Sequence, residues 1–203
     1  MQHRVKEELN FILVFVGLVW LVFLIHWMIA NRISDGGLNA WGLAPRDPGH
    51  LIGVITMPFL HGGWNHLIGN TLPLTVLLCL VAGSRANTLA VVPLVTLCGG
   101  LLLWCFGRST GSDGSKFIHV GASGLIYGLM TFLIVGGFRE QRLRELGIAV
   151  FVGIVYGGTL LSGIVPLGAA KGVSWDGHLS GAVGGIVAAV VLIPRRNRGR
   201  NPA

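Results

Sequence analysis

Six long apolar stretches constrain this chain more than any other feature of its sequence. A helix that crosses a bilayer needs about 20 predominantly apolar residues. Only 11% of the residues are charged, whereas about a quarter are charged in a typical soluble domain. We therefore predict an all-α polytopic membrane protein that folds as a bundle of six transmembrane helices. The expected spans are Phe11–Ala30, Leu67–Ala82, Leu89–Phe106, Ile118–Gly137, Leu146–Val165 and His178–Ile193.

The segments around these spans are expected to add no second domain. The first span is too long for a signal peptide, and no small-residue cleavage site follows it. Residues 31–64 are rich in Gly, Pro and Asp but also contain an apolar segment. Because long structureless loops are uncommon, we expect this connector to be partly helical and to dip into the membrane interface. The expected division is a short N-terminus (1–10), a membrane domain (11–193) and a basic tail (194–203).

The formal charge of +7 is explained by membrane topology. An even number of spans puts both termini on one side of the membrane, and basic residues gather on the cytoplasmic side. With cytoplasmic termini, the inner segments hold ten Lys and Arg residues and the outer segments hold five. We therefore expect a multi-pass protein of the cell membrane with both termini in the cytoplasm. Because no basic face with interleaved aromatic residues is visible, the expected partner is the lipid bilayer and not nucleic acid.

Polar side chains gather at the heads of three predicted spans. The sequence HGGWNHLIGN leads into the second span and carries His61, His66 and Asn70. Ser123 lies near the start of the fourth span, and His178 opens the sixth. These spans all begin on the outer side in the expected topology, so their polar groups lie at a similar depth. Ionisable residues inside membrane helices are costly and indicate a functional site.

Glycines on the fourth and sixth spans would let these two helices approach closely. Gly124 and Gly128 have GxxxG spacing, and a longer stripe on the sixth span consists of Gly177, Gly181 and Gly185. Small faces of this kind let membrane helices pack at short distance. A reactive Ser–His pair needs a separation of about 2.6–3.2 Å. The glycines therefore favour Ser123 and His178 as a pair.

Each polar residue also has a structural interpretation. A serine in a membrane helix usually bonds to its own backbone, and a lone histidine or asparagine can simply join two helices. A transporter pathway is a further alternative, but it predicts polar groups through the full depth of the bilayer and is favoured by internal repeats, which are not visible here. Purely structural roles, with no redox chemistry, are expected for His26, His50, His119, Cys79, Cys98 and Cys105.

Together these motifs resemble the rhomboid family of intramembrane serine proteases. HGGWNHLIGN, GASG and GHLSG occur in the family's order, each at the head of its own helix, and the resemblance covers residues 11–193. It implies a protease that cleaves transmembrane segments of membrane-protein substrates with no cofactor and no metal. In the expected topology its active site opens to the extracytoplasmic side. The alternative is a non-catalytic rhomboid-like protein that binds membrane proteins, although such relatives lack the serine or the histidine.

The resemblance implies a role for each motif residue. Ser123 is the expected nucleophile, and His178 is its general base. His66 and Asn70 correspond to the family's second-helix pair that stabilises the oxyanion. Backbone N–H groups at the start of the fourth helix, from Gly121 to Ser123 and including that of Ala122, are expected to join them. The expected supporting residues are His61, Tyr127, which packs on the catalytic histidine, Gly121, Gly124 and Gly181.

Two positions depart from the family pattern. Gly177 precedes His178 where many relatives carry alanine, and both residues are small. Ile52 and Gly53 stand in the first loop where some bacterial members carry Trp-Arg, which leaves the anchoring of that loop open. Asp176 points to a different helix face from His178, so we predict a Ser–His dyad. The expected substrate gate is the glycine-rich fifth span with residues 166–175.

Overall fold

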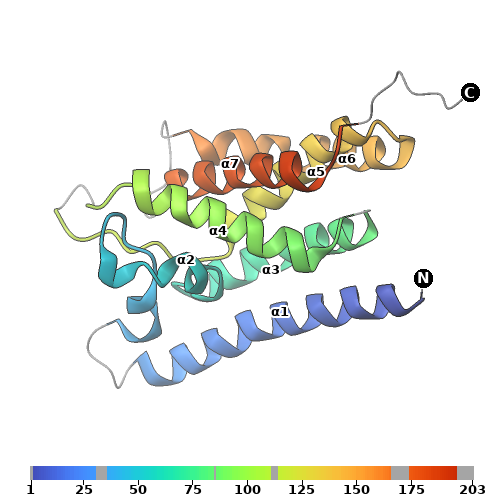
Figure 1. Cartoon of the computed structure of the whole chain (residues 1–203). Coiled ribbons are helices and arrows are strands. Elements are labelled where there is room, and N and C mark those ends of the chain that lie inside the picture. The colour runs from blue at the N-terminus through green and yellow to red at the C-terminus, as the bar shows by residue number, and fades with distance from the viewer. Residues whose placement is uncertain (1, 31–35, 85, 111–113, 166–173, 196–203) are drawn as a thin grey trace, which may run out of the picture.

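The described part of the chain is helical. The computed structural model describes residues 2–30, 36–84, 86–110, 114–165 and 174–195, and no β-strand occurs among them (Figure 1). The α-helices are α1 (Gln2–Ala30), α2 (Gly53–Thr56), α3 (Trp64–Gly83), α4 (Thr88–Phe106), α5 (Ser123–Glu140), α6 (Leu143–Ile164) and α7 (Trp175–Leu192). Three short 3-10 helices are η1 (Gly37–Trp41), η2 (Pro48–His50) and η3 (Met57–Phe59).

The prediction of an all-α polytopic bundle is confirmed. Within the described ranges, five helices are long and apolar enough to cross a membrane, namely α1, α3, α4, α6 and α7. The remaining long helix, α5, lies at the centre of the bundle and packs on α3, α4, α6 and α7. The start of α1 and the end of α7 lie at the same end of the bundle (Figure 1). That arrangement agrees with an even number of crossings.

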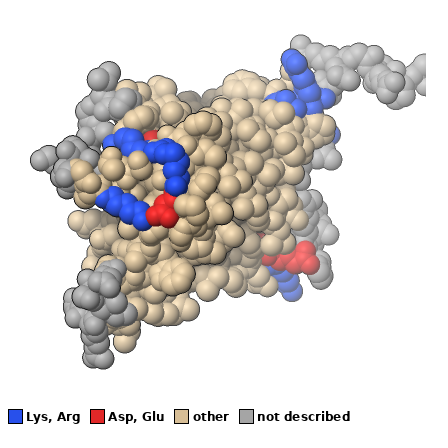
Figure 2. Space-filling model, turned by 60° about the vertical axis from the view of Figure 1, so that its left-hand side comes forward, with Lys and Arg blue, Asp and Glu red and all other residues tan. Residues whose placement is uncertain are grey.

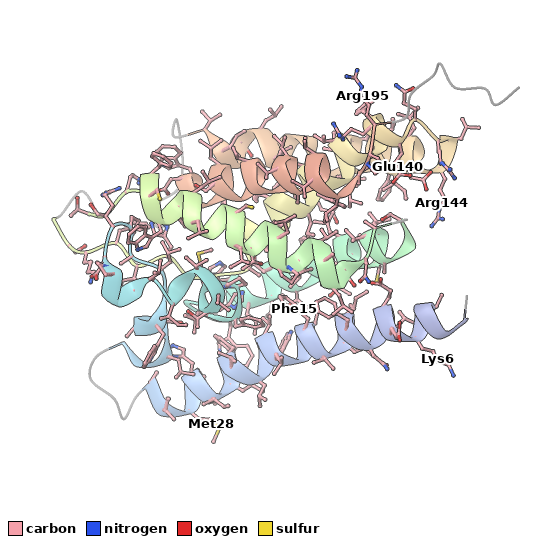
Figure 3. The ribbon with its side chains drawn as sticks, viewed as in Figure 1. Lys6, Phe15, Met28, Glu140, Arg144 and Arg195 are labelled. Carbon is pink, nitrogen blue, oxygen red and sulfur yellow. The ribbon has the colours of Figure 1, made fainter. Side chains whose placement is uncertain are left out.

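Charged side chains gather at the ends of the molecule. On the face drawn in Figure 2, they lie toward the two ends, with a broad uncharged band between them. Lys6, Glu140, Arg144 and Arg195 mark the end at which α1 begins and α7 ends (Figure 3). An uncharged band between two charged ends suits the hydrocarbon core of a bilayer. Residues 196–203 of the predicted basic tail lie outside the described residues.

Helix α1 covers one side of the bundle and is attached along its length. Phe15 points toward the bundle, where its ring centroid lies 5.0 Å from that of Phe59, whereas Met28 points away (Figure 3). The indole N–H of Trp20 donates to Thr71 Oγ1 at 3.2 Å. Near the other end of α1, the buried Glu8 accepts hydrogen bonds from the backbone and the hydroxyl of Thr88 in the first turn of α4.

The fourth predicted span begins at Ser123 and not at Ile118, so that boundary was wrong. The residues before Ser123 are held extended, because His119 pairs with Leu43 through two backbone hydrogen bonds of 2.8 and 3.0 Å. Gly121 then turns the chain with a φ of 116°, a conformation that favours glycine. Ser123 is consequently the first residue of α5 and does not lie in the interior of a helix.

The first loop is partly helical, as predicted, and is anchored on the segment after α4. Arg46 N–H donates to the carbonyl of Trp104 at 2.9 Å, and its guanidinium donates to the carbonyl of Gly107 at 2.8 Å. Gly53 packs directly on the loop, because a Cβ at this position would lie 2.3 Å from Leu43 Cα. Backbone pairing and Arg46 therefore anchor a loop whose attachment the sequence left open.

Backbone contact between α5 and α7 is the closest helix packing near the centre of the bundle. A Cβ at Gly181 would lie 1.9 Å from the carbonyl oxygen of Gly124, and a Cβ at Gly185 would lie 1.9 Å from that of Gly128. We call these four glycines the α5–α7 seam. Thr131 Oγ1 adds a hydrogen bond across the helices by donating to the carbonyl of Ala182 at 2.7 Å. The predicted close approach of these two helices is present.

We predict that Gly181→Leu lowers the thermal stability of the detergent-solubilised protein more than Gly181→Ala does. Both variants place atoms where the Gly124 carbonyl lies, and overpacking of this kind costs about 1–3 kcal/mol. Val191→Leu is the matched control, because Val191 is 65% exposed on the same helix and has room for a larger side chain. Equal melting temperatures for Gly181→Leu and Val191→Leu would contradict the observed seam.

Candidate active site

A cavity of about 810 Å³ opens among α3, α5, α6 and α7. It brings together five of the residues that the sequence analysis singled out, and these are His66, Asn70, Ser123, Tyr127 and His178. Apolar side chains such as Pro73, Ile126 and Met130 line other parts of its wall. The cavity therefore combines polar groups with a surface that suits an apolar polypeptide segment.

Ser123 stands at the N-terminus of α5, next to the turn at Gly121. A Cβ at Gly121 would lie 2.5 Å from the ring of His66, so only glycine leaves room for that imidazole. The Gly121 N–H donates to the carbonyl of Met57 at 2.9 Å and is not available as an oxyanion donor, in contrast to our expectation. The N–H groups of Ala122 and Ser123 donate to no backbone carbonyl of the described residues.

His178 is oriented by α5 and α6. Its ring is stacked on that of Tyr127, with centroids 4.1 Å apart and planes 5° from parallel. Its Nδ1 lies 3.0 Å from the carbonyl oxygen of Gly163, which can only accept, so Nδ1 carries the proton. In the neutral ring Nε2 is then an acceptor. No hydrogen bond joins Ser123 and His178 among the interactions of the described residues, and catalytic hydrogen bonds are often long without substrate.

The carbonyls at the end of α6 were not predicted as part of the site. The Tyr127 hydroxyl donates to the carbonyl of Thr159 at 2.8 Å, one turn before the Gly163 carbonyl that holds His178. Gly163 itself has no room for a side chain, because a Cβ there would lie 1.7 Å from the Tyr127 hydroxyl. The glycine content of this helix was the only sequence signal. The other part of the expected gate, residues 166–173, lies outside the described residues.

His61 lies behind Asn70 and does not line the cavity. The Asn70 amide donates to His61 Nε2 at 3.1 Å, and the His61 and His66 ring centroids are 5.0 Å apart. Burial of the ring, together with the smaller effect of the neighbouring His66, lowers the pKa of His61 to about 4. Neutral His61 therefore holds the Asn70 amide in one orientation.

Asp176 has partners other than His178. Its carboxylate accepts hydrogen bonds from the backbone and the guanidinium of Arg108 and forms none with His178, in agreement with a dyad. No group of three or more His, Cys, Asp or Glu side chains suited to a metal occurs within the described ranges.

Outside the cavity, His50 Nδ1 lies 3.1 Å from the Gly42 carbonyl and His26 Nε2 lies 3.2 Å from the Asn39 amide.

Known proteins match this chain over most of its length. The profile of the Rhomboid domain matches residues 48–195. An uncharacterized protein of Mycobacterium tuberculosis is 41% identical over 191 residues, which cover 93% of this chain and 77% of the relative. An uncharacterized protein of Mycobacterium leprae is 38% identical over 182 residues, covering 89% and 70%. YdcA of Bacillus subtilis, named as a candidate rhomboid protease, is 26% identical over 198 residues, covering 96% and 93%.

We predict that acid destabilises the protein partly through His61. Its folded-state pKa of about 4 lies below the ordinary value of about 6.5. The stability that neutral His61 contributes is therefore complete above about pH 6.5 and is lost as the pH falls toward 4. In His61→Gln, an amide oxygen can accept the Asn70 hydrogen bond without titrating. The melting temperature should fall less between pH 7 and pH 4.5 in this variant than in the parent, and an equal fall would contradict the prediction.

Proposed function

The chain belongs to the rhomboid family, and we propose that it is an intramembrane serine endopeptidase that cleaves transmembrane segments of membrane proteins. One observation carries the proposal. Ser123 at the start of α5 and His178 in the first turn of α7 line the same cavity, although they are far apart in the sequence. We take residues 11–193 as the catalytic domain.

His178 is the proposed general base. As Ser123 Oγ attacks the carbonyl carbon of the substrate peptide, the hydroxyl proton passes to Nε2. The same proton then passes to the leaving nitrogen when the C–N bond breaks, and water hydrolyses the acyl-enzyme. The Gly163 carbonyl supports this role, because it holds the other ring proton on Nδ1. It takes the orienting place that a carboxylate occupies in a Ser–His–Asp triad.

Four hydrogen-bond donors are proposed to stabilise the oxyanion. The N–H groups of Ala122 and Ser123 lie at the N-terminus of α5, where the helix dipole favours negative charge. The side chains of His66 and Asn70 line the same cavity from α3. His61 supports this role of Asn70 by accepting one of its amide hydrogens. Gly121 contributes space for His66 and not an N–H group.

Water and substrate are proposed to reach the cavity by different routes. The polar ends of α3, α5 and α7 lie at the end of the bundle opposite to Lys6 and Arg195. On the positive-inside rule, we propose that this end is extracytoplasmic and that both termini are cytoplasmic. Water enters from this side. A membrane-protein substrate enters from the bilayer between α3 and α6, which both line the cavity but do not pack closely on each other.

We predict that Ser123→Ala and His178→Ala each abolish cleavage of a single-span substrate in proteoliposomes and leave the melting temperature near that of the parent. Loss of either dyad member should lower kcat by roughly 10⁴-fold or more. Ser162→Ala is the control, since Ser162 is an exposed serine on α6 outside the cavity lining. Cleavage by folded Ser123→Ala at the parent rate would reject the serine mechanism. An inactive parent that still binds the substrate would favour the non-catalytic alternative.

We predict that a fluorophosphonate labels Ser123 covalently and that cleavage survives EDTA. A serine that a histidine activates reacts with such reagents, and the proposed chemistry draws no group from a metal. The measurement is mass spectrometry of the labelled peptide together with the cleavage rate with and without chelator. Loss of cleavage in EDTA with recovery on added zinc would overturn the assignment.

A further inference from the structure

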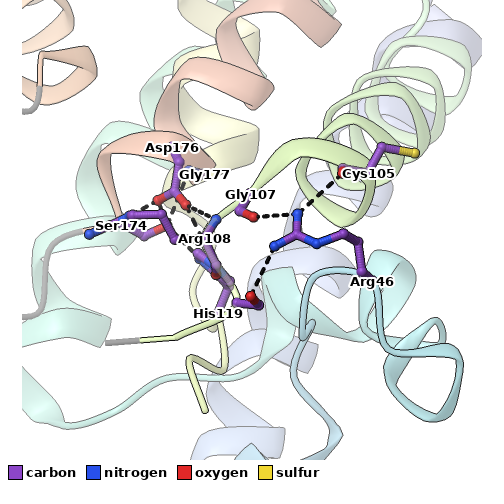
Figure 4. A network of polar contacts seen from close by, with 9 residues as sticks. Arg46, Cys105, Gly107, Arg108, His119, Ser174, Asp176 and Gly177 are labelled. Atoms are coloured by element: carbon purple, nitrogen blue, oxygen red, sulfur yellow. Dashed lines mark hydrogen bonds and ion pairs between the residues drawn. The ribbon is translucent and has the colours of Figure 1, made fainter. Parts of the chain in front are cut away.

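One part-buried hydrogen bond joins two residues that lie four positions before Ser123 and His178, respectively. His119 Nδ1 lies 2.6 Å from Ser174 Oγ (Figure 4). His119 is four residues before Ser123, and Ser174 is four residues before His178. The bond therefore ties the segment that leads into α5 to the residue that precedes α7.

The partners of His119 determine the direction of this bond. Its Nε2 lies 3.3 Å from the carbonyl oxygen of Arg108, which can only accept, so Nε2 carries the ring proton. Burial lowers the pKa of His119 below its ordinary value, although Asp176 acts in the opposite direction, so the ring is neutral at neutral pH. Nδ1 is then an acceptor, and the hydroxyl of Ser174, which also lies 3.3 Å from Asp176 Oδ1, donates to Nδ1 at the shorter distance.

Ser174 also starts α7. Its Oγ accepts a hydrogen bond from the N–H of Gly177 at 3.1 Å, which makes Ser174 the N-cap of the helix. One hydroxyl therefore both caps α7 and contacts His119. His119 is in turn held on the first loop by its backbone pairing with Leu43. The start of α7 is thus connected to the anchored loop through a single imidazole.

Arg108 and Asp176 form a second connection between the segment that joins α4 to α5 and the start of α7. Asp176 Oδ2 accepts from the Arg108 backbone at 2.8 Å, and Oδ1 accepts from its guanidinium at 3.0 Å (Figure 4). The guanidinium lies over the rings of Phe117 and Trp175, 5.0 and 5.2 Å from their centroids. Asp176 is 6% exposed and His119 is 2% exposed. The Arg108 side chain is 41% exposed, so the buried members are His119 and Asp176, and hydrogen bonds to buried groups favour one arrangement.

We propose that a positioning network sets the separation of Ser123 and His178. Its members are Arg108, His119, Ser174 and Asp176. The inference rests on the proposed dyad. The network joins the segments that precede the two residues, and the α5–α7 seam brings the helix backbones together just beyond them. The dyad is thus held between a polar attachment and a backbone contact.

His119 tests the network most directly, because it does not line the cavity and its variants cannot act by contact with the substrate. His119→Phe removes both ring nitrogens and should lower kcat by ~10–100-fold with KM within about threefold of the parent. His119→Gln should recover most of that loss, because its amide oxygen can accept from Ser174 and its amide nitrogen can donate to the Arg108 carbonyl. A merely structural role would not be rescued through these two bonds.

Ser174→Ala has a matched control in Asn87→Ala. Asn87 caps α4 through its side chain, which accepts from the Leu89 N–H at 2.8 Å at the opposite end of the bundle. Loss of either cap should lower the melting temperature by a similar amount. Only Ser174→Ala should lower kcat, and Ser174→Thr, which retains the hydroxyl, should stay near the parent value. Equal effects of the two alanine variants on kcat would overturn the proposal.

A measurement that needs no proteolysis separates this inference from the proposed function. In a chain with Cys79, Cys98 and Cys105 replaced by alanine, Ser123→Cys places a thiol beside His178. A thiol near a histidine ionises at a lower pH, and the pH midpoint of its alkylation reports that proximity. Adding His119→Phe should raise the midpoint by about one unit, whereas adding Asn87→Ala should not.

The outcomes of the two assays are distinct. If the parent neither cleaves substrate nor reacts with a fluorophosphonate, the proposed function fails, and the thiol midpoint still decides whether the network positions His178. If the parent is active but His119→Phe keeps both its kcat and the thiol midpoint, the positioning network is rejected. If His119→Phe does not fold, Ser174→Ala against Ser174→Thr decides in the thiol assay, because Ser174 lines the cavity and only that assay excludes an effect of substrate contact.

Discussion

The arrangement of polar groups in this protein depends on how closely the backbones of α5 and α7 approach each other. At the seam, the carbonyls of one helix occupy the space in which side chains of the other would lie. Lipid provides no hydrophobic drive for helix association, so such contacts hold membrane helices together through van der Waals attraction and interhelical hydrogen bonds. Thr131 contributes one such bond. The seam glycines follow Ser123 and His178 in α5 and α7. The close approach of the two helices there determines which side chains at their N-terminal ends can meet.

Three polar side chains of the cavity wall have hydrogen-bond partners that fix their orientation. His178 is bonded to a backbone carbonyl, Tyr127 to another, and Asn70 to His61. Polar groups at membrane depth are tolerated where they line a cavity or are bonded within the protein. Two of these bonds end on carbonyls of α6, the candidate span with the smallest buried share. The least buried long helix therefore contributes directly to the orientation of the proposed base.

The features that the sequence predicted correctly are those that depend on which side chains are apolar and which are polar. Apolar length indicated the long helices, and the cost of polar groups in lipid singled out Ser123, His178, His66 and Asn70. The start of α5 was missed because Ile118 and Val120 are apolar for another reason: both pack on the first loop beside Gly42. The role of the Gly163 carbonyl was missed, and Gly121 was predicted to donate an N–H group where it instead provides space for His66. Backbone carbonyls and N–H groups look alike at every position in a sequence. His119 was assigned a structural role, and its link to Ser174 required the fold.

Among the described helices that line the cavity, α7 comes after α3, α5 and α6, and this order has a consequence for biosynthesis. A membrane protein is synthesised from its N-terminus, so the residues of α3, α5 and α6 that line the cavity are made before His178. Until α7 docks, the serine lacks its proposed base, the α5 glycines lack their α7 partners and the His119 imidazole lacks the Ser174 hydroxyl. Under the proposed function, a nascent chain that lacks α7 is therefore inactive, and docking of this helix supplies the base.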